Sequence, residues 1–414
     1  MNKTHLCKMM DLADVTSAKR IFARDYVSAG IPFYRGKEIT ELHRGALNVS
    51  TDLFITVEKF LEIKKKHGAP EEGDVLLTSV GTLGSVYVVK SSDRFYFKDG
   101  NVTWFRNLVG VTGAYLRYWL ISPEGRAQLQ KCMIGSSQSA YTIENLKRME
   151  IRLPSLETQG RITSILGAYD DLIEVNRRRI AALEEMARGL FEEWFVRFRF
   201  PGHEAVAIED TPDGSLPAGW SWGRFADLAS EIRDTVLPES VDPATPYIGL
   251  EHISRRSTTL AEHGTAADVS SLKARFRRGD ILFGKIRPYF HKVAWAPFGG
   301  VASTDVIIWR PTAALTAQAL LQASSDAFVA HSVQTSNGTK MPRANTKVLA
   351  DYRCALAPSN ISERFENAVG PMIESAASLQ AANLILATAR DLLLPRLISG
   401  QLSVTQAERE LWAA

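Results

Sequence analysis

The sequence LPSLETQGRITSILGAYDDLIEVNRRRIAALEEMARGLFEEWF occupies residues 153–195, and LAPSNISERFENAVGPMIESAASLQAANLILATARDLLLPRL occupies residues 356–397. Apolar side chains recur every three or four residues in both stretches, an average spacing near 3.5 that is typical of a coiled-coil seam. Each seam has a polar break, Asn176 in the first and Asn383 in the second. At about 1.5 Å per residue, 35–40 helical residues span roughly 50–60 Å. We expect two long helices that pack against each other, or alternatively each on its own globular segment.

Shorter motifs precede both stretches in the same order, which indicates an internal duplication. Gly73-Asp-Val-Leu76 is echoed by Gly279-Asp-Ile-Leu282, and Pro32-Phe-Tyr34 is echoed by Pro246-Tyr247. The polar residues 135–138 have a counterpart at 337–340. The separation between counterparts drifts from 214 to about 203 positions, as expected of a duplicated unit with loop insertions.

The duplication divides the chain into two mixed segments, 1–152 and 206–356, and two helical segments, 153–205 and 357–414. Short apolar runs bounded by Gly, Asp and Pro predict strands in the mixed segments, accompanied by short helices. The Pro- and Gly-containing residues 211–219 indicate a linker between the copies. We therefore expect an α+β fold of two related globular domains and two long helices.

Composition excludes several classes of protein. The 414 residues are 45% hydrophobic and 23% charged, with a mean hydropathy of −0.09, which is close to the average of soluble globular proteins. No apolar run reaches the roughly 18 residues that a membrane span needs, and the N-terminus lacks a signal-peptide core. The three cysteines are far apart, and the histidines form no cluster with them. We expect a cytoplasmic protein without membrane contact, disulfide framework or metal site.

The sequence also lacks the motifs of the common catalytic sites. It contains neither a dinucleotide-binding nor a P-loop glycine motif, and no Asn-Pro-Pro-Tyr-like or Asp-Pro-Pro-Tyr-like tetrapeptide of the adenine methyltransferases. Asp280 and Lys285 have the spacing of a nuclease pair, but no second carboxylate for a metal lies between them. We expect no catalytic residue in this chain.

Basic residues are clustered in the two mixed segments. Residues 272–292 carry seven Lys and Arg side chains against one acid, Asp280, with aromatic residues interleaved. Cations and flexible polar loops suit phosphate neutralisation and the reading of base edges, although a single cluster can equally be an ordinary solvated face. The candidate DNA contacts are Arg35, Lys37, Lys64, Lys65, Thr78, Thr82, Ser137, Gln138 and Tyr141 in the first segment, and Lys285, Arg287, Tyr289, Lys340 and Arg343 in the second.

Several longer motifs occur together and in order. In the first copy they are Ile31-Pro-Phe-Tyr-Arg-Gly-Lys-Glu-Ile39, Gly73-Asp-Val-Leu-Leu-Thr-Ser-Val-Gly-Thr-Leu-Gly84, Leu153-Pro-Ser155 and Leu190-Phe-Glu-Glu-Trp-Phe195. In the second they are Leu216-Pro-Ala-Gly-Trp220, Gly279-Asp-Ile-Leu-Phe-Gly-Lys-Ile-Arg287 and Leu393-Leu-Pro-Arg-Leu-Ile-Ser-Gly-Gln401. Over nearly its whole length the sequence resembles the specificity (S) subunit of type I restriction–modification systems. The first copy departs from the pattern because it lacks a Leu-Pro-x-Gly-Trp opening.

The resemblance implies two target recognition domains in a pseudo-twofold repeat, each reading one half of a split site in double-stranded DNA. The long helices would form an antiparallel ruler that fixes the unread spacer. Two methyltransferase subunits would bind the helices and carry the restriction subunits. This chain would bind no cofactor, whereas S-adenosylmethionine would bind the methyltransferase, and ATP and Mg²⁺ the restriction subunit.

Three aromatic residues at the end of the first long helix are candidates for the partner surface, namely Phe191, Trp194 and Phe195. Trp194 continues the seam and can equally pack on the second helix, whereas the two Phe residues share an adjacent face. The alternatives to DNA recognition are a coiled-coil scaffold that joins two protein-binding modules and, last, a metal-dependent nuclease.

Overall fold

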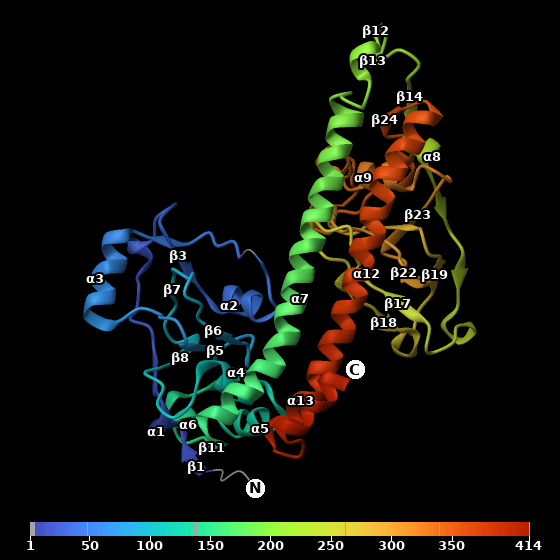
Figure 1. Cartoon of the computed structure of the whole chain (residues 1–414). Helices are drawn as coiled ribbons and strands as arrows, with labels where there is room; N and C mark the ends of the chain where they lie inside the picture. The colour runs from blue at the N-terminus through green and yellow to red at the C-terminus, as the bar shows by residue number, and fades with distance from the viewer. Residues whose placement is uncertain (1–4, 48, 136–138, 261, 339, 414) are drawn as a thin grey trace. The chain divides into compact units, whose positions relative to one another are not determined.

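The computed structural model describes residues 5–47, 49–135, 139–260, 262–338 and 340–413. The chain forms two compact units (Figure 1): unit 1 comprises Met1–Glu174 with Ile385–Ala414, and unit 2 comprises Val175–Leu384. Both long helices, α7 (Leu156–Phe191) and α12 (Ser359–Ile398), begin in one unit and end in the other.

A four-stranded antiparallel sheet forms the centre of unit 1. Its order is β2-β8-β5-β6, with bounds Asp14–Ser17, Val102–Arg106, Val75–Thr78 and Val86–Val88. All four residues of β5 are buried, because Val75 and Leu77 pack in one apolar cluster and Leu76 packs in another on the opposite face. A continuous apolar run is the pattern expected of a strand covered on both faces.

A second, smaller sheet of unit 1 has the order β4-β3-β7 (Phe54–Ile55, Ile31–Tyr34, Tyr96–Phe97), and its β3–β7 pair is parallel. Helix α2 (Gly36–His43) follows β3, and α3 (Val57–His67) follows β4. The Thr56 hydroxyl accepts a hydrogen bond from the Lys59 amide at the start of α3, which satisfies one amide that a helix start leaves unpaired. Gly68, with φ of +86°, ends the helix.

The rest of the globular part of unit 1 consists of short elements with similar local signals. Thr112 caps α4 (Gly113–Ile121), Ser122 caps α5 (Pro123–Lys131) and Thr142 caps α6 (Ile143–Lys147). Strands β9 (Met133–Ile134) and β10 (Ala140–Tyr141) form a hairpin, and β1 (His5–Lys8), which precedes α1 (Met9–Leu12), pairs with β11 (Glu150–Leu153).

Unit 2 repeats the central sheet of unit 1 strand for strand. The order is β15-β23-β20-β21, with bounds Ala229–Ile232, Val306–Pro311, Ile281–Gly284 and Val293–Trp295. The register also repeats, since Val75 pairs with Phe105 and Val88, and Ile281 pairs with Trp309 and Trp295. The duplication expected from the sequence is confirmed.

The second sheet of unit 2 is larger than its counterpart in unit 1. Its order is β16-β19-β22-β17-β18 (Thr235–Val236, Lys273–Phe276, Gly300–Ser303, Pro246–Ile248, Gly264–Thr265), and its β17–β22 pair is parallel like β3–β7. Unit 2 also contains α8 (Phe225–Leu228), α9 (Thr316–Ala323), α10 (Asp326–Gln334), α11 (Thr346–Ala350) and the antiparallel pair β14 (Ser221–Arg224) and β24 (Arg353–Leu356).

The two long helices pack on each other within each unit. In unit 1, Ile162 and Leu166 of α7 share a cluster with Leu394 and Leu397 of α12 and with residues of α13 (Val404–Ala413). The same cluster contains residues of the central sheet, so the helices also pack on their globular segment. In unit 2, Ala187 lies in a cluster with α12 side chains. Both packing arrangements considered for the sequence therefore occur together.

The polar breaks of the two seams meet inside unit 2. The side-chain amide of Asn176 donates a hydrogen bond of 3.0 Å to the amide oxygen of Asn383. Both side chains are buried. The polar residues are therefore partners rather than isolated faults in an apolar stripe.

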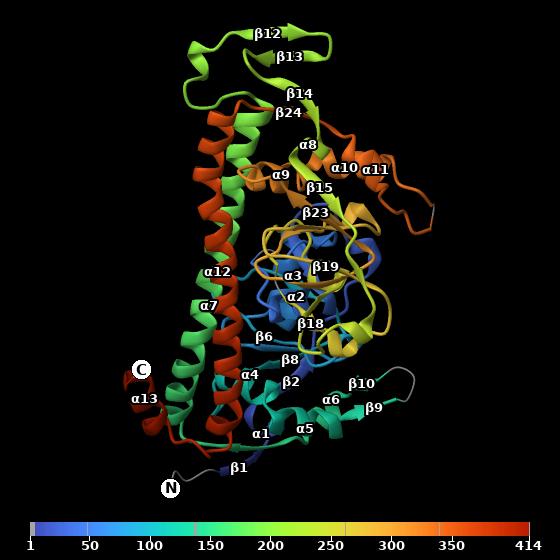
Figure 2. The ribbon, with the colours of Figure 1, turned by 90° about the vertical axis from the view of Figure 1, so that its right-hand side faces the viewer.

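Residues 211–219 are more regular than the predicted linker. Strands β12 (Ile208–Thr211) and β13 (Gly214–Pro217) form a hairpin next to the end of α7 (Figure 2). The two residues of the turn are Pro212 and Asp213, and Gly214, the first residue of β13, has φ of +120°. Among the described residues, no helix has both the length and the apolar character that a bilayer crossing requires.

Candidate nucleic-acid interface

The loop that follows β20 in unit 2 is held in a defined conformation. Arg287 and His291 have φ of +50° and +52°, a region that few residues other than glycine adopt. They flank the short 3-10 helix η7 (Pro288–Phe290). The loop is fixed to residues 342–344 by a bridge, in which the Arg287 amide donates to Pro342 O at 2.8 Å and the Ala344 amide donates to Lys285 O at 2.9 Å.

This bridge brings together cations that are distant in the sequence. Lys285 and Arg287 are half-buried, whereas Tyr289 and Arg343 are exposed. Arg343 lies 3.9 Å from the Asp305 carboxylate. The Nε of Arg287 is buried and has no hydrogen-bond partner in the described part of the chain. Lys340, also exposed, lies two residues before Pro342 in the sequence.

The sequence reasoning missed one member of this surface. The guanidinium of exposed Arg255 lies 4.0 Å from the ring centroid of Phe290, a cation–π contact. Arg255 belongs to the double-arginine run Arg255-Arg256, far from residues 272–292 in the sequence. Only the fold shows that it faces the loop after β20.

Unit 1 has the same pair of loops at the same place. The loop after β5 is bridged to the β9–β10 hairpin through Val80 and Ala140, and the Tyr141 amide donates to Ser79 O at 3.0 Å. Thr82 is exposed at the loop tip, and Tyr141 is half-buried. Two other candidates, Ser137 and Gln138, lie outside the described residues.

The start of α2 borders the same loop. A Cβ placed on Gly36 would lie 3.8 Å from the Thr78 side chain and from Val80 O. Lys37 is exposed, 3.7 Å from Glu41. The structure therefore places the Arg35–Lys37 segment beside the loop after β5.

Arg35 is engaged by two carboxylates. Its Nη2 lies 2.8 Å from both Glu38 and Asp52. Burial disfavours ionisation of Glu38, but hydrogen bonds from the Arg35 side chain and amide outweigh burial, so the pKa of Glu38 is lowered. Arg35 therefore stabilises the start of α2, and its charge is largely neutralised within the protein.

Thr78 lies on the inner side of the loop after β5. Its side chain is fully buried, and its hydroxyl accepts a hydrogen bond of 2.9 Å from the Ser85 amide. The hydroxyl closes the loop after β5 from the inside and does not face solvent. A sequence motif cannot distinguish this position from the exposed Thr82, four residues later.

Lys64 and Lys65 are not brought to this loop. Both are exposed in the last turn of α3, where Lys64 lies 3.3 Å from Glu71. Lys65 instead lines a hollow with Arg106 and the end of β2. The structure therefore separates them from the surface that contains Thr82 and Tyr141.

The predicted partner-binding aromatics are buried in this chain. Phe191, Trp194 and Phe195 are between 5% and 6% exposed and belong to an apolar cluster of unit 2. The two Phe rings stack 5.6 Å apart, and the rings of Trp194 and Phe195 pack on Phe365 of α12. Within this chain the three side chains therefore form part of the core of unit 2. Adjacent aromatics at a helix end predict burial but do not reveal what covers them.

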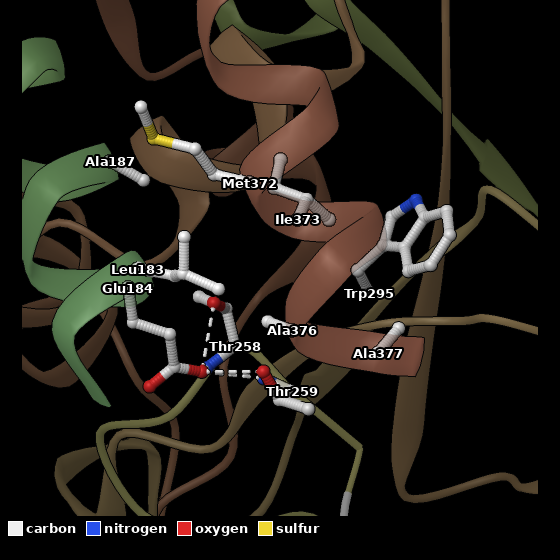
Figure 3. A pocket seen from close by; sticks show the side chains of 10 residues that line it. All are labelled: Leu183, Glu184, Ala187, Thr258, Thr259, Trp295, Met372, Ile373, Ala376 and Ala377. Carbon is white, nitrogen blue, oxygen red and sulfur yellow. Dashed lines mark hydrogen bonds between the residues drawn. The ribbon is translucent and has the colours of Figure 1, made fainter. Parts of the chain in front are cut away.

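Glu184 anchors α7 to the globular part of unit 2 (Figure 3). Its Oε1 accepts hydrogen bonds from the hydroxyls of Ser257, Thr258 and Thr259 and from the amides of Thr258 and Thr259, at 2.7–3.2 Å. The adjoining crevice has a volume of only about 10 Å³, close to the space of one water molecule. This feature positions the domain on the helix and is not a ligand site.

The Asp280 carboxylate, on which the nuclease alternative depends, is bound by an arginine of the same unit. Both oxygens of buried Asp280 accept hydrogen bonds of 2.8 Å from Arg310. Within the described residues, no group of three or more His, Cys, Asp or Glu side chains is arranged to hold a metal ion. Asp280 therefore has a structural role beside the central sheet.

The sequence is similar to those of known specificity subunits. Residues 4–185 match the family model described as type I restriction modification DNA specificity domain. The chain is 24% identical over 419 residues to the type I restriction enzyme MjaIX specificity subunit of Methanocaldococcus jannaschii, covering 96% of this chain and 93% of that protein. It is 33% identical over 175 residues to a putative type I restriction enzyme specificity subunit of Haemophilus influenzae, covering 42% of this chain and 41% of the relative.

A solved structure shares the fold. The type I restriction–modification S subunit from M. genitalium has a TM-score of 0.55 at 13% sequence identity, with 96% of both chains covered. The resemblance to type I specificity subunits that the motifs indicated is confirmed.

Proposed function

We propose that this chain, which is similar to a type I specificity subunit over 96% of its length, is the DNA-recognition subunit of a type I restriction–modification complex. The observation that carries the proposal is the repeated loop pair. Val80 meets Ala140 in unit 1 and Ile286 meets Arg343 in unit 2, at equivalent positions of two sheets with the same order and register. One framework thus presents two different sets of side chains, as expected of two readers of different half-sites.

The side chains of the two loop pairs suit different base patterns. Unit 2 presents Lys285, Arg287 and Arg343, and Arg and Lys preferentially contact guanine O6 and N7 in the major groove. Unit 1 presents hydroxyl groups at Thr82 and Tyr141, which can donate to or accept from base edges and phosphates. The two units would therefore recognise unlike halves of a split site in double-stranded DNA.

A segment exchange tests this function in the assembled complex. Residues 206–356 would be replaced by the corresponding segment of another specificity subunit and expressed with the methyltransferase of this system. Sequencing of methylated DNA should show one new half-site and one unchanged half-site, and exchange of residues 1–152 should give the reciprocal result. A change in both halves after either exchange contradicts separate reading.

The partners follow from the same assignment. Two methyltransferase subunits would bind this chain, and restriction subunits would bind through them. With the aromatic cluster buried, exposed apolar residues of α12 are the better candidates: Ile385 and Leu392 are 71% and 67% exposed and lie seven residues apart. That spacing places both on one helix face, and apolar side chains clustered on a surface are typical of protein contacts.

The variant Ile385→Glu/Leu392→Glu should lose co-purification with the methyltransferase while its helix content and Tm are retained. Leu61→Glu is the control, because Leu61 is also apolar, 54% exposed and helical, but belongs to α3. Methyltransferase retention by the double variant would place the partner surface elsewhere.

Catalysis would belong to the partners. S-adenosylmethionine would bind the methyltransferase subunits, and ATP and Mg²⁺ would bind the restriction subunits. The purified chain with Mg²⁺ should neither cleave nor methylate DNA, and methyl transfer should begin only when the methyltransferase is added. Cleavage by the chain alone would favour the nuclease alternative.

A further inference from the structure

An open hollow of about 510 Å³ lies in unit 1 between the end of α3 and strands β2 and β8. The charged side chains that line it are Lys19, Lys65, Lys66 and Arg106. No Asp or Glu is among its described lining residues. The sequence reasoning selected Lys65 but neither Lys19 nor Arg106, because residues 19, 65 and 106 meet only in the fold.

The charges in the hollow are only partly balanced. Lys66 lies 2.9 Å from Glu62, and Arg106 lies 3.9 Å from Asp14. Lys19 and Lys65 are exposed, and in the described part of the chain no carboxylate lies within ion-pair distance of either side chain. Two cations therefore face the hollow without a counter-charge from the protein.

The second copy of the sheet shows what the framework itself requires. Strand register makes Arg106 the counterpart of Arg310, and Asp74 the counterpart of Asp280. In unit 2 the arginine binds the aspartate through two hydrogen bonds of 2.8 Å.

In unit 1 a tryptophan takes the place of this arginine at the equivalent aspartate. A main-chain amide bonds the aspartate in both units, from Glu71 in unit 1 and from Arg277 in unit 2. The Asp74 carboxylate accepts from Trp104 Nε1 at 2.8 Å and from the Glu71 amide at 2.9 Å. The counterpart of Trp104 is Ile308, which has no side-chain donor. Arg106 therefore does not bind the aspartate as Arg310 does. Its guanidinium lies 4.7 Å from the Trp104 ring centroid, and its Nη1 donates a hydrogen bond to the main-chain oxygen of His67.

We propose that this hollow binds a phosphate group of the DNA backbone without reading bases. The proposal rests on the proposed function and adds a second contact region to unit 1, separate from the loops after β5 and at the β9–β10 hairpin. Lys side chains provide point charges without base selectivity, and Arg106 retains N–H groups for a phosphate oxygen. Such contacts release counterions and make binding salt-dependent.

The test compares two double variants of the full-length chain in complex with its methyltransferase. Lys19→Ala/Lys65→Ala removes the unbalanced charges of the hollow. Lys8→Ala/Lys131→Ala removes the same charge from exposed positions of unit 1 in β1 and α5. Affinity for a labelled duplex of mixed sequence is measured over a range of salt concentrations, and the methylated motif is sequenced for each variant.

Removal of the two charges from the hollow should reduce the steepness of log K against log salt by about 0.9 for each phosphate that is no longer neutralised, while the methylated motif stays the same. If the slope changes no more than it does in the control variant, the hollow does not bind a backbone phosphate, and the proposed function remains intact. Absence of duplex binding by the wild-type complex overturns the proposed function itself.

Inorganic phosphate is titrated as a separate probe of the hollow. One contrary outcome is that it raises the Tm of the wild-type complex but not of the Lys19→Ala/Lys65→Ala variant, while the two have equal salt dependence of DNA binding. In that case the site takes a free anion, and the assignment to the DNA backbone is wrong.

Discussion

Arg287 combines the features expected of a base-reading side chain. Its main chain is fixed by the Pro342 hydrogen bond and by a φ of +50°, and its half-buried side chain belongs to the loop after β20 that also presents Lys285 and Tyr289. Arg287→Ala keeps a Cβ and therefore does not change the backbone strain. We predict that it weakens binding to the recognised duplex by about 1–3 kcal/mol and relaxes preference at one base pair.

Fluorescence anisotropy with the recognised duplex and with singly substituted duplexes measures both effects of Arg287→Ala. Arg233→Ala is the control, because Arg233 is exposed in the same unit and lies 2.7 Å from Glu231. Equal affinities for Arg287→Ala, Arg233→Ala and wild type would remove Arg287 from the DNA surface.

Asp170 connects three elements of unit 1 through one carboxylate. It accepts hydrogen bonds from Arg117 and Tyr118 of α4 and from Arg390 of α12. Burial disfavours its charged form, but Arg117, Tyr118 and Arg390 outweigh burial, so the pKa of Asp170 is lowered. A lowered pKa in the folded state means that the ionised carboxylate stabilises the fold above the unfolded-state pKa, near 4, and that this stability is lost as pH falls through the folded value.

Asp170→Asn should therefore lower the free energy of unfolding by about 1.5–3 kcal/mol at pH 7, the scale of hydrogen bonds to a charged group. The difference from wild type should begin to shrink as pH falls below about 4, where the carboxylate of the unfolded state binds a proton, and should disappear once the pH has fallen through the lowered pKa of the folded state. Asp171→Asn, at the exposed neighbouring position, should change stability little. Denaturant titrations at several pH values would contradict the assignment if the Asp170→Asn difference were independent of pH.

At the scale of elements, the sequence predicts the regular parts of the fold well, because each has a local physical signal. The buried runs at Val75–Thr78 and Ile281–Gly284 are strands, and the 3.5-residue spacing predicts α7 and α12. Side-chain exposure was less predictable. Thr78 and Thr82 belong to one motif but have opposite environments, because the hydrogen bond from the Ser85 amide depends on how the loop closes.

The Asn176–Asn383 contact gives the helix pair a register that apolar side chains alone do not specify. Sliding one helix past the other would separate the amides and leave two buried polar groups without a partner, at a cost of about 1–3 kcal/mol each. Asn176→Leu or Asn383→Leu should each destabilise the protein by about that amount, because the remaining amide is left unpaired. The double substitution should cost less than the sum of the two single substitutions.

A double-mutant cycle from denaturant unfolding measures this coupling. Ala181→Leu, at an exposed position of α7, controls for the added apolar side chain. If the two single effects are strictly additive, the two amides do not act as a pair.

At the scale of the whole molecule, the duplication is the feature that the sequence determined best. Motifs of the Gly-Asp-x-Leu type recur in order, and the sheets that contain them have the same order and register. The candidate site was less accessible to sequence reasoning. Cations at positions 255, 285 and 343 are joined only by tertiary bridges, and Arg106 is recognised only beside its counterpart Arg310.

The last prediction concerns the two long helices as a ruler for the unread spacer. Four residues inserted after Arg178 and four after Ala382 lengthen each helix by about 6 Å, close to a full turn. The Asn176–Asn383 hydrogen bond lies within unit 2, and both insertions fall within three residues of it in the sequence, on the side away from unit 1. B-DNA rises about 3.4 Å per base pair, so the paired insertion should lengthen the spacer of the methylated motif by one or two pairs and leave both half-sites unaltered. Each added pair also turns the far half-site by about 35°, because 10–10.5 pairs make one turn of DNA.

Insertion in one helix alone should lower the Tm, because every apolar contact beyond it falls out of register. Sequencing of methylated DNA reads the spacer directly, and an unchanged spacer in a folded, active paired variant would show that the helices do not set it.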